Sequence, residues 1–488
     1  MKADLVIKNG LVCTDHGVIR GGIAAKDGII VAIDEDNNLP EAEQVYDAKG
    51  LYVMPGVVEP HCHLGINQHA DGTDVGSEQY YADMTTESKA AVVGGITTIN
   101  TTIEGIGPGG KRFFGVKNKY ENVIDAWKNA YCDIKYYVGL ADDEEVEEFN
   151  QLRKEGIFSC GKIFLGFRGP NAAQFGHPEA GYSNDFLYRA NVALKAQPGP
   201  VKCMYHCEDA VLMDEYAPPI EKEEPVCGNY LALWNKSRPG WLEAMDLCKV
   251  AYISKVTECP IYIVHMSAKE TVDQLKYFKD RNYDITGETC LHYLIFSCED
   301  DIAFNNPDWV NQAKVSPPIR GKADRDALWK GIFDGTISTI GTDHVAYEAH
   351  CNKIGTGDFW HARPGCGDGM SYLMAGVFDE GVNKRGLPIE KFVKLMSENP
   401  AKALGIYPQK GALKVGSDFD AVIFDPYKKW TVDSTKTYSF HQGSMYNGHE
   451  FQGKAMATFV RGTLVAEDGK VVIDKPIAQY VKNNYARV

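Results

Sequence analysis

The sequence of 488 residues contains no apolar run long enough to cross a bilayer, and its first segment, MKADLVIKNG, lacks the apolar centre of a signal peptide. It also lacks a surplus of basic residues, because 51 Lys and Arg stand against 66 Asp and Glu, a net charge of −15 at pH 7. Proteins that track nucleic-acid phosphates need such a surplus. We therefore expect a cytoplasmic protein that binds neither membranes nor nucleic acids.

Paired cysteine motifs are missing as well. The 13 cysteines are scattered and form no CxxC spacing. In a chain without a secretion signal, this scatter predicts reduced thiols, most of them small core residues, rather than a disulfide framework. The hydrophobic content of 44% is ordinary for a globular protein. The length predicts a large barrel-type domain with a smaller one beside it.

The middle of the chain alternates short apolar strands with longer helical patterns, which is typical of a parallel α/β fold. Eight strand-like runs can be counted, from GVVEPHCH to ISTIGTD, and eight is the number in a (β/α)8 barrel of the TIM type. The two chain ends instead show short strands separated by NG and DG turns, too few at either end to bury a core alone. We predict that residues 56–405 form the barrel, and that residues 1–55 and 406–488 together form a small β-sandwich.

Potential metal ligands close several of the predicted barrel strands. GVVEPHCH ends in His61 and His63, KCMYH in His206, IYIVH in His265 and ISTIGTD in Asp343. The carboxyl ends of barrel strands form the active-site face, and residues two apart in a strand point the same way. One such histidine alone is more often an ordinary core or surface residue. Imidazoles and a carboxylate converging from several strand ends favour zinc or a related divalent metal.

Lys162 stands at the start of the apolar run IFL in the segment SCGKIFLGFR. Lysine is seldom fully buried without a partner, because desolvation disfavours its charge. One interpretation is a lysine whose ammonium reaches solvent at the strand end. The other is a lysine that has reacted with carbon dioxide, since a carbamate is chemically a carboxylate and can bridge two metal ions. The neighbouring ligands favour the carbamate.

Taken in order, these segments resemble the amidohydrolase superfamily, specifically its cyclic-amide branch of dihydropyrimidinases and hydantoinases. The resemblance covers nearly the whole chain and rests on GVVEPHCHL, GKIFLGF, YHCED, IVHMSAKE, GETCLHYL, KVSPPIR, GTDH and the C-terminal segment HQGSMYNGHEFQGKAMATFVRGTLVAEDGK. It implies a binuclear metal site, usually of zinc, with a carbamylated bridging lysine. The implied ligands are His61, His63, Lys162, His206, His265 and Asp343.

The resemblance also implies a reaction. A metal-activated hydroxide attacks a ring carbonyl, and Asp343 passes the proton to the leaving ring nitrogen, so that the ring opens to an N-carbamoyl amino acid or a similar product. The substrate is then a small cyclic amide. Relatives are commonly tetramers, so the resemblance further implies a homotetramer or homodimer.

Two positions depart from the family pattern. Five residues beyond the bridging lysine, the family usually has a tyrosine that supports the developing oxyanion, whereas this chain has Phe167, which cannot donate a hydrogen bond. Arg168 or His69 could supply a donor instead. In DFWHARPGCGDG, His361 takes the place of an asparagine that reads the ring amide, and Arg363 adjoins Pro364.

Arginine is suited to bidentate recognition of a carboxylate, so Arg363 raises the possibility of a carboxylated substrate. Pairing with an acidic neighbour, Asp358 or Asp368, is the equally weighted alternative. The candidate substrate contacts are Phe167, Arg168, Thr289, His361 and Arg363.

The first hypothesis is therefore a hydrolase acting on a dihydropyrimidine, hydantoin or related cyclic ureide. Alternatives are an allantoinase-like enzyme, a hydrolase of a carboxylate-bearing ring, and a hydrolase of an acyclic amide or a larger ring. Dihydroorotase is disfavoured, because His63 is followed by Leu64 and not by the arginine of that family. A non-catalytic, dihydropyrimidinase-related oligomeric protein is the hypothesis from a different class, and the complete ligand set argues against it.

Overall fold

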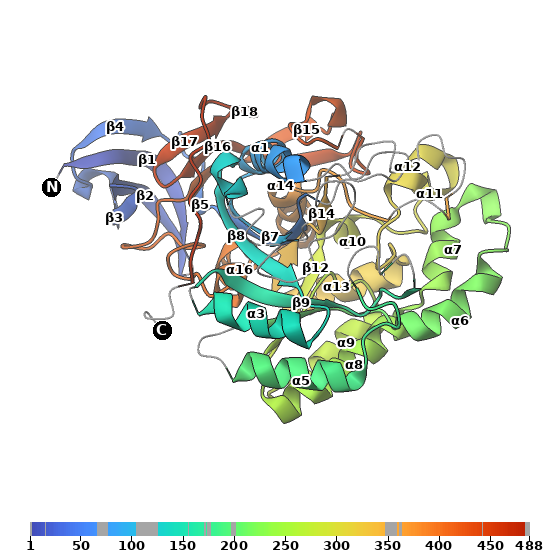
Figure 1. Cartoon of the computed structure of the whole chain (residues 1–488). Coiled ribbons are helices and arrows are strands. Elements are labelled where there is room, and N and C mark those ends of the chain that lie inside the picture. Colours follow the sequence, from blue (N-terminus) through green and yellow to red (C-terminus); the bar gives the residue numbers. More distant parts are fainter. Residues whose placement is uncertain are drawn as a thin grey trace.

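The computed structural model contains two nine-stranded sheets, one curled and parallel, the other mostly antiparallel (Figure 1). Among the described residues, no helix combines the length and apolar character needed to cross a bilayer. The structure describes residues 2–14, 16–65, 77–103, 125–154, 156–169, 172, 177–196, 202–346, 359–360, 364–441 and 443–483.

The parallel sheet curls into the predicted barrel. Its strands are β6 (Val57–His63), β7 (Ile96–Ile103), β8 (Asp133–Gly139), β9 (Phe158–Phe164), β10 (Lys202–His206), β11 (Ile261–Ile263), β12 (Ile285–Cys290), β13 (Thr339–Gly341) and β14 (His344–Val345). Neighbouring strands follow the chain order from β6 to β13, and β14 then pairs with β6. Since β14 follows β13 after two residues, the sheet closes on itself. The predicted (β/α)8 class is confirmed.

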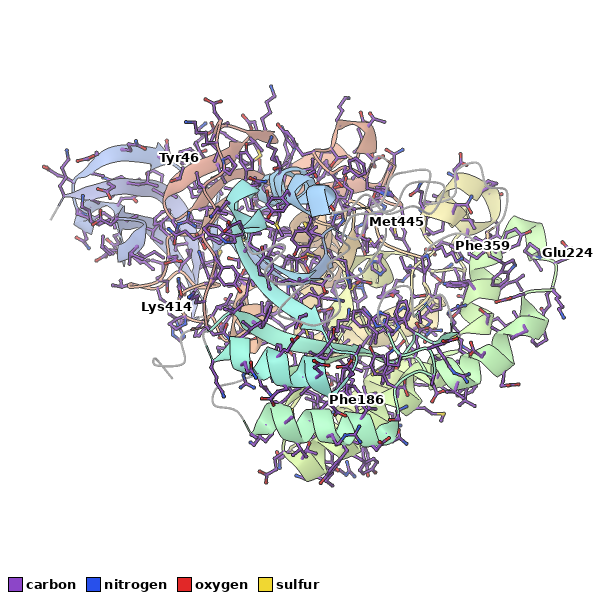
Figure 2. The ribbon with its side chains drawn as sticks, viewed as in Figure 1. Tyr46, Phe186, Glu224, Phe359, Lys414 and Met445 are labelled. Atoms are coloured by element: carbon purple, nitrogen blue, oxygen red, sulfur yellow. The ribbon has the colours of Figure 1, made fainter. Side chains whose placement is uncertain are left out.

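The strand sequences suit this position. Every residue of β7, ITTINTTI, is buried, as expected for a strand of β-branched residues covered on both faces. The main covering helices are α1 (Ser77–Val93), α3 (Asp143–Arg153), α5 (Asn184–Lys195), α6 (Ala210–Ile220), α7 (Tyr230–Ser237), α8 (Gly240–Thr257), α9 (Lys269–Lys279) and α13 (Lys322–Asp334). Phe186, labelled in Figure 2, is one of the buried side chains through which α5 packs on the barrel.

Shorter helices follow the seventh and eighth barrel strands. They are α10 (Leu291–Ile295), α11 (Ile302–Asn305), α12 (Pro307–Gln312), α14 (Leu373–Val377), α15 (Ile389–Val393) and α16 (Asn399–Ala403). The sequence ENVIDAWKNAY, residues 121–131, is typical of a helix. Its described part contains only the 3-10 turn Ala126–Asn129. The Trp127 carbonyl there accepts the Ala130 N–H, which ends the turn immediately before β8.

The second sheet joins both ends of the chain, as predicted. Its strands are β1 (Ala3–Thr14), β2 (Gly17–Lys26), β3 (Ile29–Asp34), β4 (Ala42–Asp47), β5 (Tyr52–Pro55), β15 (Ala421–Thr431), β16 (Glu450–Val460), β17 (Thr463–Glu467) and β18 (Lys470–Val471). Antiparallel pairing of β5 with β15 makes the connection. Tyr46 of β4, labelled in Figure 2, also packs edge-on against Phe459 of β16, with ring centroids 5.2 Å apart.

A buried ionic cluster fastens the barrel to this sheet. The Lys410 ammonium is 2.8 Å from carboxylate oxygens of both Asp418 and Asp420 and also pairs with Asp133, the first residue of β8. Arg461, in the turn between β16 and β17, pairs with Asp133 from the other side. Burial acts to lower the pKa of Lys410, but the three carboxylates outweigh it and hold that pKa above its ordinary value. Lys410 therefore stays charged inside the cluster.

We predict that Lys410→Met destabilises the protein by about 3–5 kcal/mol, because it leaves three buried carboxylates without their shared cation. Urea denaturation at pH 7, followed by tryptophan fluorescence, measures the change. Lys436→Met is the matched control, since Lys436 pairs with Asp433 on the surface and should leave the unfolding free energy unchanged. Equal stability of Lys410→Met and the wild-type protein would contradict this account of the junction.

A candidate metal centre at the carboxyl end of the barrel

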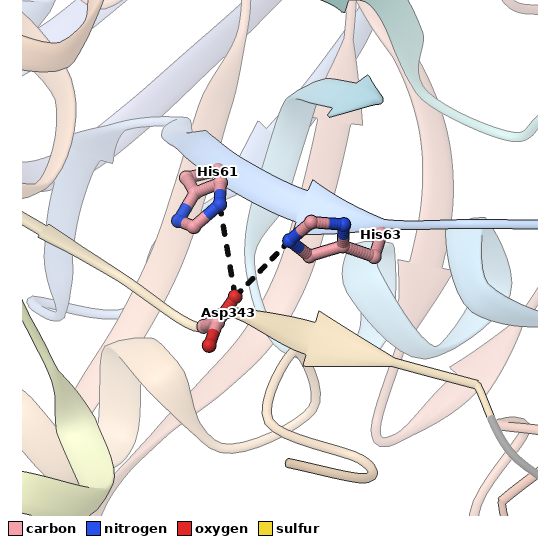
Figure 3. A group of neighbouring side chains, drawn as sticks. All are labelled: His61, His63 and Asp343. Carbon is pink, nitrogen blue, oxygen red and sulfur yellow. Dashed lines mark ion pairs between the residues drawn. The ribbon is translucent and has the colours of Figure 1, made fainter. Parts of the chain in front are cut away.

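Three predicted ligands meet where β6 faces the end of β13 (Figure 3). His61 and His63 are the last inward-facing residues of β6, and Asp343 lies between β13 and β14. The Asp343 Oδ1 atom is 3.6 Å from His61 Nε2 and 3.3 Å from His63 Nε2. All three residues are buried. The two-residue spacing of the histidines thus delivers both rings to one carboxylate, as the strand period requires.

Lys162 enters the same place from β9. Its side chain is fully buried, with Nζ 2.6 Å from His61 Nε2 and 3.3 Å from His63 Nε2. The interpretation of a lysine reaching solvent is therefore wrong, since the amine points at the imidazoles in the barrel interior. An amine there can carry a carbamate into the centre of the cluster.

His206 and His265 supply the opposite side. His206 ends β10 and His265 follows β11, and their ring centroids are 4.5 Å apart. The ring of His265 also lies 5.5 Å from that of His61. Gly166 permits this approach, because a Cβ at that position would lie 2.5 Å from His206 Nε2. The pair His206 and His265 therefore lies beside the group of His61, His63 and Asp343, and the six-residue ligand set stays a prediction.

Backbone strain marks two of these positions. His265 has φ +39° and Asp343 has φ +50°, conformations that residues with a Cβ adopt only when the surroundings enforce them. Each residue follows the last residue of a short buried strand by two positions. The strained turns aim these side chains at the centre instead of along the sheet.

The protonation of the cluster suits a cation. Burial and the nearby Lys162 charge lower the pKa of His61 well below its ordinary value, and burial with the charge of His206 does the same for His265. Burial acts to raise the pKa of Asp343, but the hydrogen bond from His63 and nearby positive charge hold it below its ordinary value. Neutral imidazoles and an ionised carboxylate are the forms that bind metal.

Two further observations fit a metal ion. His265 Nδ1 is buried and has no hydrogen-bond partner among the described residues. Burial also raises the pKa of Glu59 to about 7 and that of Glu288 well above its ordinary value, because it disfavours their charged forms. A bound cation would favour the charged forms of these two carboxyl groups. The donor set and its charge therefore fit a divalent metal ion.

The second group of three carboxylates has a different role. Asp133, Asp418 and Asp420 lie close enough together to hold an ion. Lys410 already occupies the position between them, as described above. This group is therefore an internal salt bridge of the fold, and the histidine cluster is the candidate metal centre.

Sequence reasoning missed the residues that hold the ligands in place. Glu288 of β12 lies with Oε1 3.1 Å from His61 Nδ1 and accepts the His265 N–H and the Tyr262 hydroxyl. Glu59 accepts the His61 N–H at 2.9 Å. Such partners fix the ring orientation of a ligating histidine. The sequence EPH could have indicated the role of Glu59, because Glu59 lies two residues before His61 and therefore on the same face of β6.

A cavity of about 310 Å³ adjoins the cluster at His206. Phe167 and Arg168, which stay predicted substrate contacts, line this cavity, and Arg168 Nη1 is paired at 2.9 Å with Asp214. Thr289 is fully buried, and its hydroxyl donates to the Met266 carbonyl at 2.8 Å. The hydroxyl of Thr289 is therefore committed to the fold.

Other predicted contacts lie outside the described residues: His69, His361, Arg363 and the proposed alternative partner Asp358. Asp368, the other alternative partner of Arg363, is buried and accepts hydrogen bonds from Ser371 and Tyr372.

Known proteins resemble this chain over its full length. The profile of the amidohydrolase family matches residues 271–465. The D-hydantoinase of Ralstonia pickettii is 29% identical over 98% of each chain, and an allantoinase of Escherichia coli is 28% identical over 95% of each. The solved structure of L-hydantoinase (dihydropyrimidinase) from Arthrobacter aurescens aligns with a TM-score of 0.85 and 27% identity, covering 98% of this chain and 100% of that one.

We predict that Glu288→Gln weakens metal binding about 10- to 100-fold, because the amide cannot replace the carboxylate beside His61 Nδ1. Competition with a chromogenic chelator at pH 7.5 measures the affinity. Glu145→Gln is the control, since Glu145 is also buried but accepts the Ala141 N–H at the start of α3. An unchanged affinity in Glu288→Gln, with weakened binding in the control, would refute the assigned role.

Proposed function

We propose that this chain, which is a cyclic amidohydrolase of the hydantoinase and dihydropyrimidinase branch, hydrolyses the ring C–N bond of a dihydropyrimidine, hydantoin or related cyclic ureide. The observation that carries the proposal is the buried group of His61, His63 and Asp343, with Lys162 within hydrogen-bond distance of His61 and the His206–His265 pair beside a cavity. The chain thus offers both a candidate metal centre and a cavity for a small ring. His206 belongs to both, because it is a predicted metal ligand and also lines the cavity.

Two divalent ions, most often zinc, would be held by His61 and His63 on one side and by His206 and His265 on the other. Bound metal supplies a water made acidic enough to react near neutral pH and polarises a carbonyl. The chain's own residues do the rest. Asp343, held ionised, accepts the proton of the attacking water and returns it to the leaving ring nitrogen.

Lys162 contributes its position between His61 and His63. As a carbamate it would present two oxygens from a nitrogen that is already within 2.6 Å of His61 Nε2. The modification also removes the cost of a buried ammonium beside a cation, because the carbamate is an anion. Because the Lys162 side chain is fully buried, its carbamate would be shielded from water.

Phe167 leaves the oxyanion without the usual tyrosine donor, and we assign that role to His177. The His177 ring packs at a tilt against Phe167, with centroids 5.0 Å apart, and against Phe164 at 4.7 Å. Its Nδ1 lies 3.0 Å from the Tyr182 hydroxyl, which orients the ring. The Phe167 ring in turn lies 5.6 Å from that of His206. An imidazole N–H beside the aromatic ring can serve where the phenol is missing.

An allantoinase-like substrate is the second candidate, and the cavity wall favours it. Lys314 and Arg238 line the wall and pack on the Trp234 ring. Glu208 lines it too, with a buried carboxylate oxygen, Oε1, that has no partner among the described residues. The other Glu208 oxygen, Oε2, is held 2.9 Å from His206 Nε2, so Oε1 stands ready for a donor on the ring substituent, as in the ureido group of allantoin.

The function is tested by a ring-opening assay on metal-loaded protein with bicarbonate, comparing dihydrouracil, neutral 5-substituted hydantoins, allantoin and carboxylated hydantoins. We expect turnover of at least one ring, and Asp343→Asn should lower kcat about 10²- to 10⁴-fold through loss of proton transfer. No turnover of any ring by protein that binds two metals would instead support the non-catalytic hypothesis.

We predict that activity depends on carbon dioxide through Lys162. Apoprotein loaded with metal in carbon-dioxide-free buffer should recover little activity, and bicarbonate should restore it with slow kinetics. Lys162→Gln should show no response to bicarbonate. Equal activity of the wild-type protein with and without bicarbonate, starting from carbamate-free apoprotein, would exclude the modification.

We predict that Phe167→Tyr compensates for loss of His177. His177→Phe should lower kcat roughly 100-fold or more, the usual cost of one oxyanion donor, with a smaller change in KM. Adding Phe167→Tyr to that variant should recover at least part of the loss, because the phenol restores a donor. Tyr188→Phe, on the outer face of α5, is the control. The assignment fails if the double variant is no faster than His177→Phe.

A further inference from the structure

A second cavity, of about 490 Å³, lies between the barrel and the antiparallel sheet. Its lining comes from the end of α1, the region of α14, the strands β15 and β16 and the β17–β18 turn. Figure 1 shows α1 and α14 beside β16, which both helices contact. Among the described residues, none lines both this cavity and the cavity at His206. A cavity of this volume is large enough for a small ligand, so it is a separate candidate binding site.

Three aromatic side chains line this cavity, and the fold holds them in place. The Trp430 ring is half-buried, and its Nε1 donates to the Gly453 carbonyl at 3.0 Å. Buried Tyr372 packs against the Trp430 ring with centroids 6.1 Å apart. The Tyr438 hydroxyl accepts the Val471 N–H at 3.2 Å. Rings that are already fixed lose little freedom when a ligand packs on them, so this lining favours a flat ring.

Two lysines stand at the same cavity without an anionic partner. Lys454 Nζ lies 5.0 Å over the centroid of the Trp430 ring, and its ammonium forms no ion pair or hydrogen bond with any described residue. The same holds for exposed Lys470, the first residue of β18. A Cβ at Gly469 would lie 3.7 Å from Lys454 Nζ, so the turn that carries Lys470 lies directly against Lys454. The two ammonium groups therefore belong to one site.

The charge of the lining is unbalanced. Lys436 and Asp433 both line the cavity, but they pair with each other at 2.6 Å. Lys454 and Lys470 then stand against one remaining carboxylate of the lining, that of Asp468. The whole chain carries a net charge of −15, so a basic lining is a local departure from the rest of the molecule. Lysine ammonium groups bind phosphate and carboxylate as point charges, and an anion between these two would supply the missing counter-charge.

Repulsion between lysines points the same way. Burial and the charge of nearby Lys428 lower the pKa of Lys454 below its ordinary value, and Asp468 acts in the opposite direction. Keeping a partly buried ammonium close to another cation costs free energy. A bound anion would offset both the burial and the repulsion.

We propose that this cavity binds a small anion with a flat ring, whose acid group lies between Lys454 and Lys470 and whose ring packs on Trp430 and Tyr438. The acid group is a phosphate, as in a mononucleotide, or the carboxylate of an aromatic acid. The site is separate from the candidate metal centre. The proposal therefore does not depend on the proposed reaction, and its tests measure binding without turnover.

The first test is isothermal titration calorimetry on the full, metal-loaded chain at pH 7.5. The probes are adenosine 5′-monophosphate and N-carbamoyl-phenylglycine, each compared with its uncharged counterpart, adenosine or N-carbamoyl-phenylglycinamide. We expect at least one anion to bind about tenfold or more tightly than its counterpart, because only the anion pairs with the lysines. The anion that binds identifies the acid group as phosphate or carboxylate. If neither anion binds more tightly than its counterpart, the proposal is wrong.

The second test locates the bound anion. Lys454→Met and Lys470→Glu should each weaken its binding about tenfold or more, because each removes a charged partner. Lys470 is exposed, so its variant should keep the fold. Lys429→Met is the matched control, since Lys429 is an exposed lysine of β15 outside the cavity lining and should leave the affinity unchanged. Full affinity in either Lys454→Met or Lys470→Glu would place the anion elsewhere and overturn the proposal.

Discussion

Buried charge at the carboxyl end of the barrel is the constraint on which the structure depends. A lysine, an aspartate and four histidines lie within a few ångströms of each other with almost no exposure. Transferring such groups from water costs several kcal/mol each unless partners compensate them. The fold compensates this cost by placing groups of opposite charge and hydrogen-bond partners next to one another. A bound divalent cation would add the remaining positive charge. The same principle explains Lys410, whose three carboxylates compensate it inside the junction between barrel and sheet.

The groups that compensate the buried charges also hold the predicted metal ligands in position. Glu288 and Glu59 reach the backbone and ring of His61, and the Tyr262 hydroxyl holds Glu288 at 2.6 Å while contacting Thr339 at 2.9 Å. This chain of contacts crosses from β6 through β12 and β11 to β13. It therefore ties the ligand-bearing strands to one another beneath the site. The left-handed backbone at His265 and Asp343 can persist because these neighbours hold it.

The sequence could predict the barrel because its strands are short apolar runs of regular spacing, and it could predict the cluster because the ligands close those runs. The sequence could not predict residues whose role depends on contacts between distant strands. Nothing local distinguishes Glu288 in GETC from an ordinary strand glutamate, and Lys410 gains its partners only when β8 meets β15. His177, for which we propose a role as donor, follows β9 by many residues in a segment without periodicity, so no sequence pattern singles it out. Thr289 stays a predicted substrate contact, although its hydroxyl bonds to the Met266 carbonyl and only its backbone remains for a substrate.

The outer surface and the active site share structural elements. The cavity beside His206 is lined by Met213 of α6 and by Trp234 and Arg238 at the end of α7, just before α8 begins. Tyr216 of the same α6 contacts Trp241 of α8 on the outside. A helix held on both faces fluctuates less than one held on a single face, because more buried contacts must break before it opens. The Tyr216–Trp241 contact therefore steadies the cavity wall from behind, because Tyr216 and the cavity-lining Met213 belong to the same helix, α6.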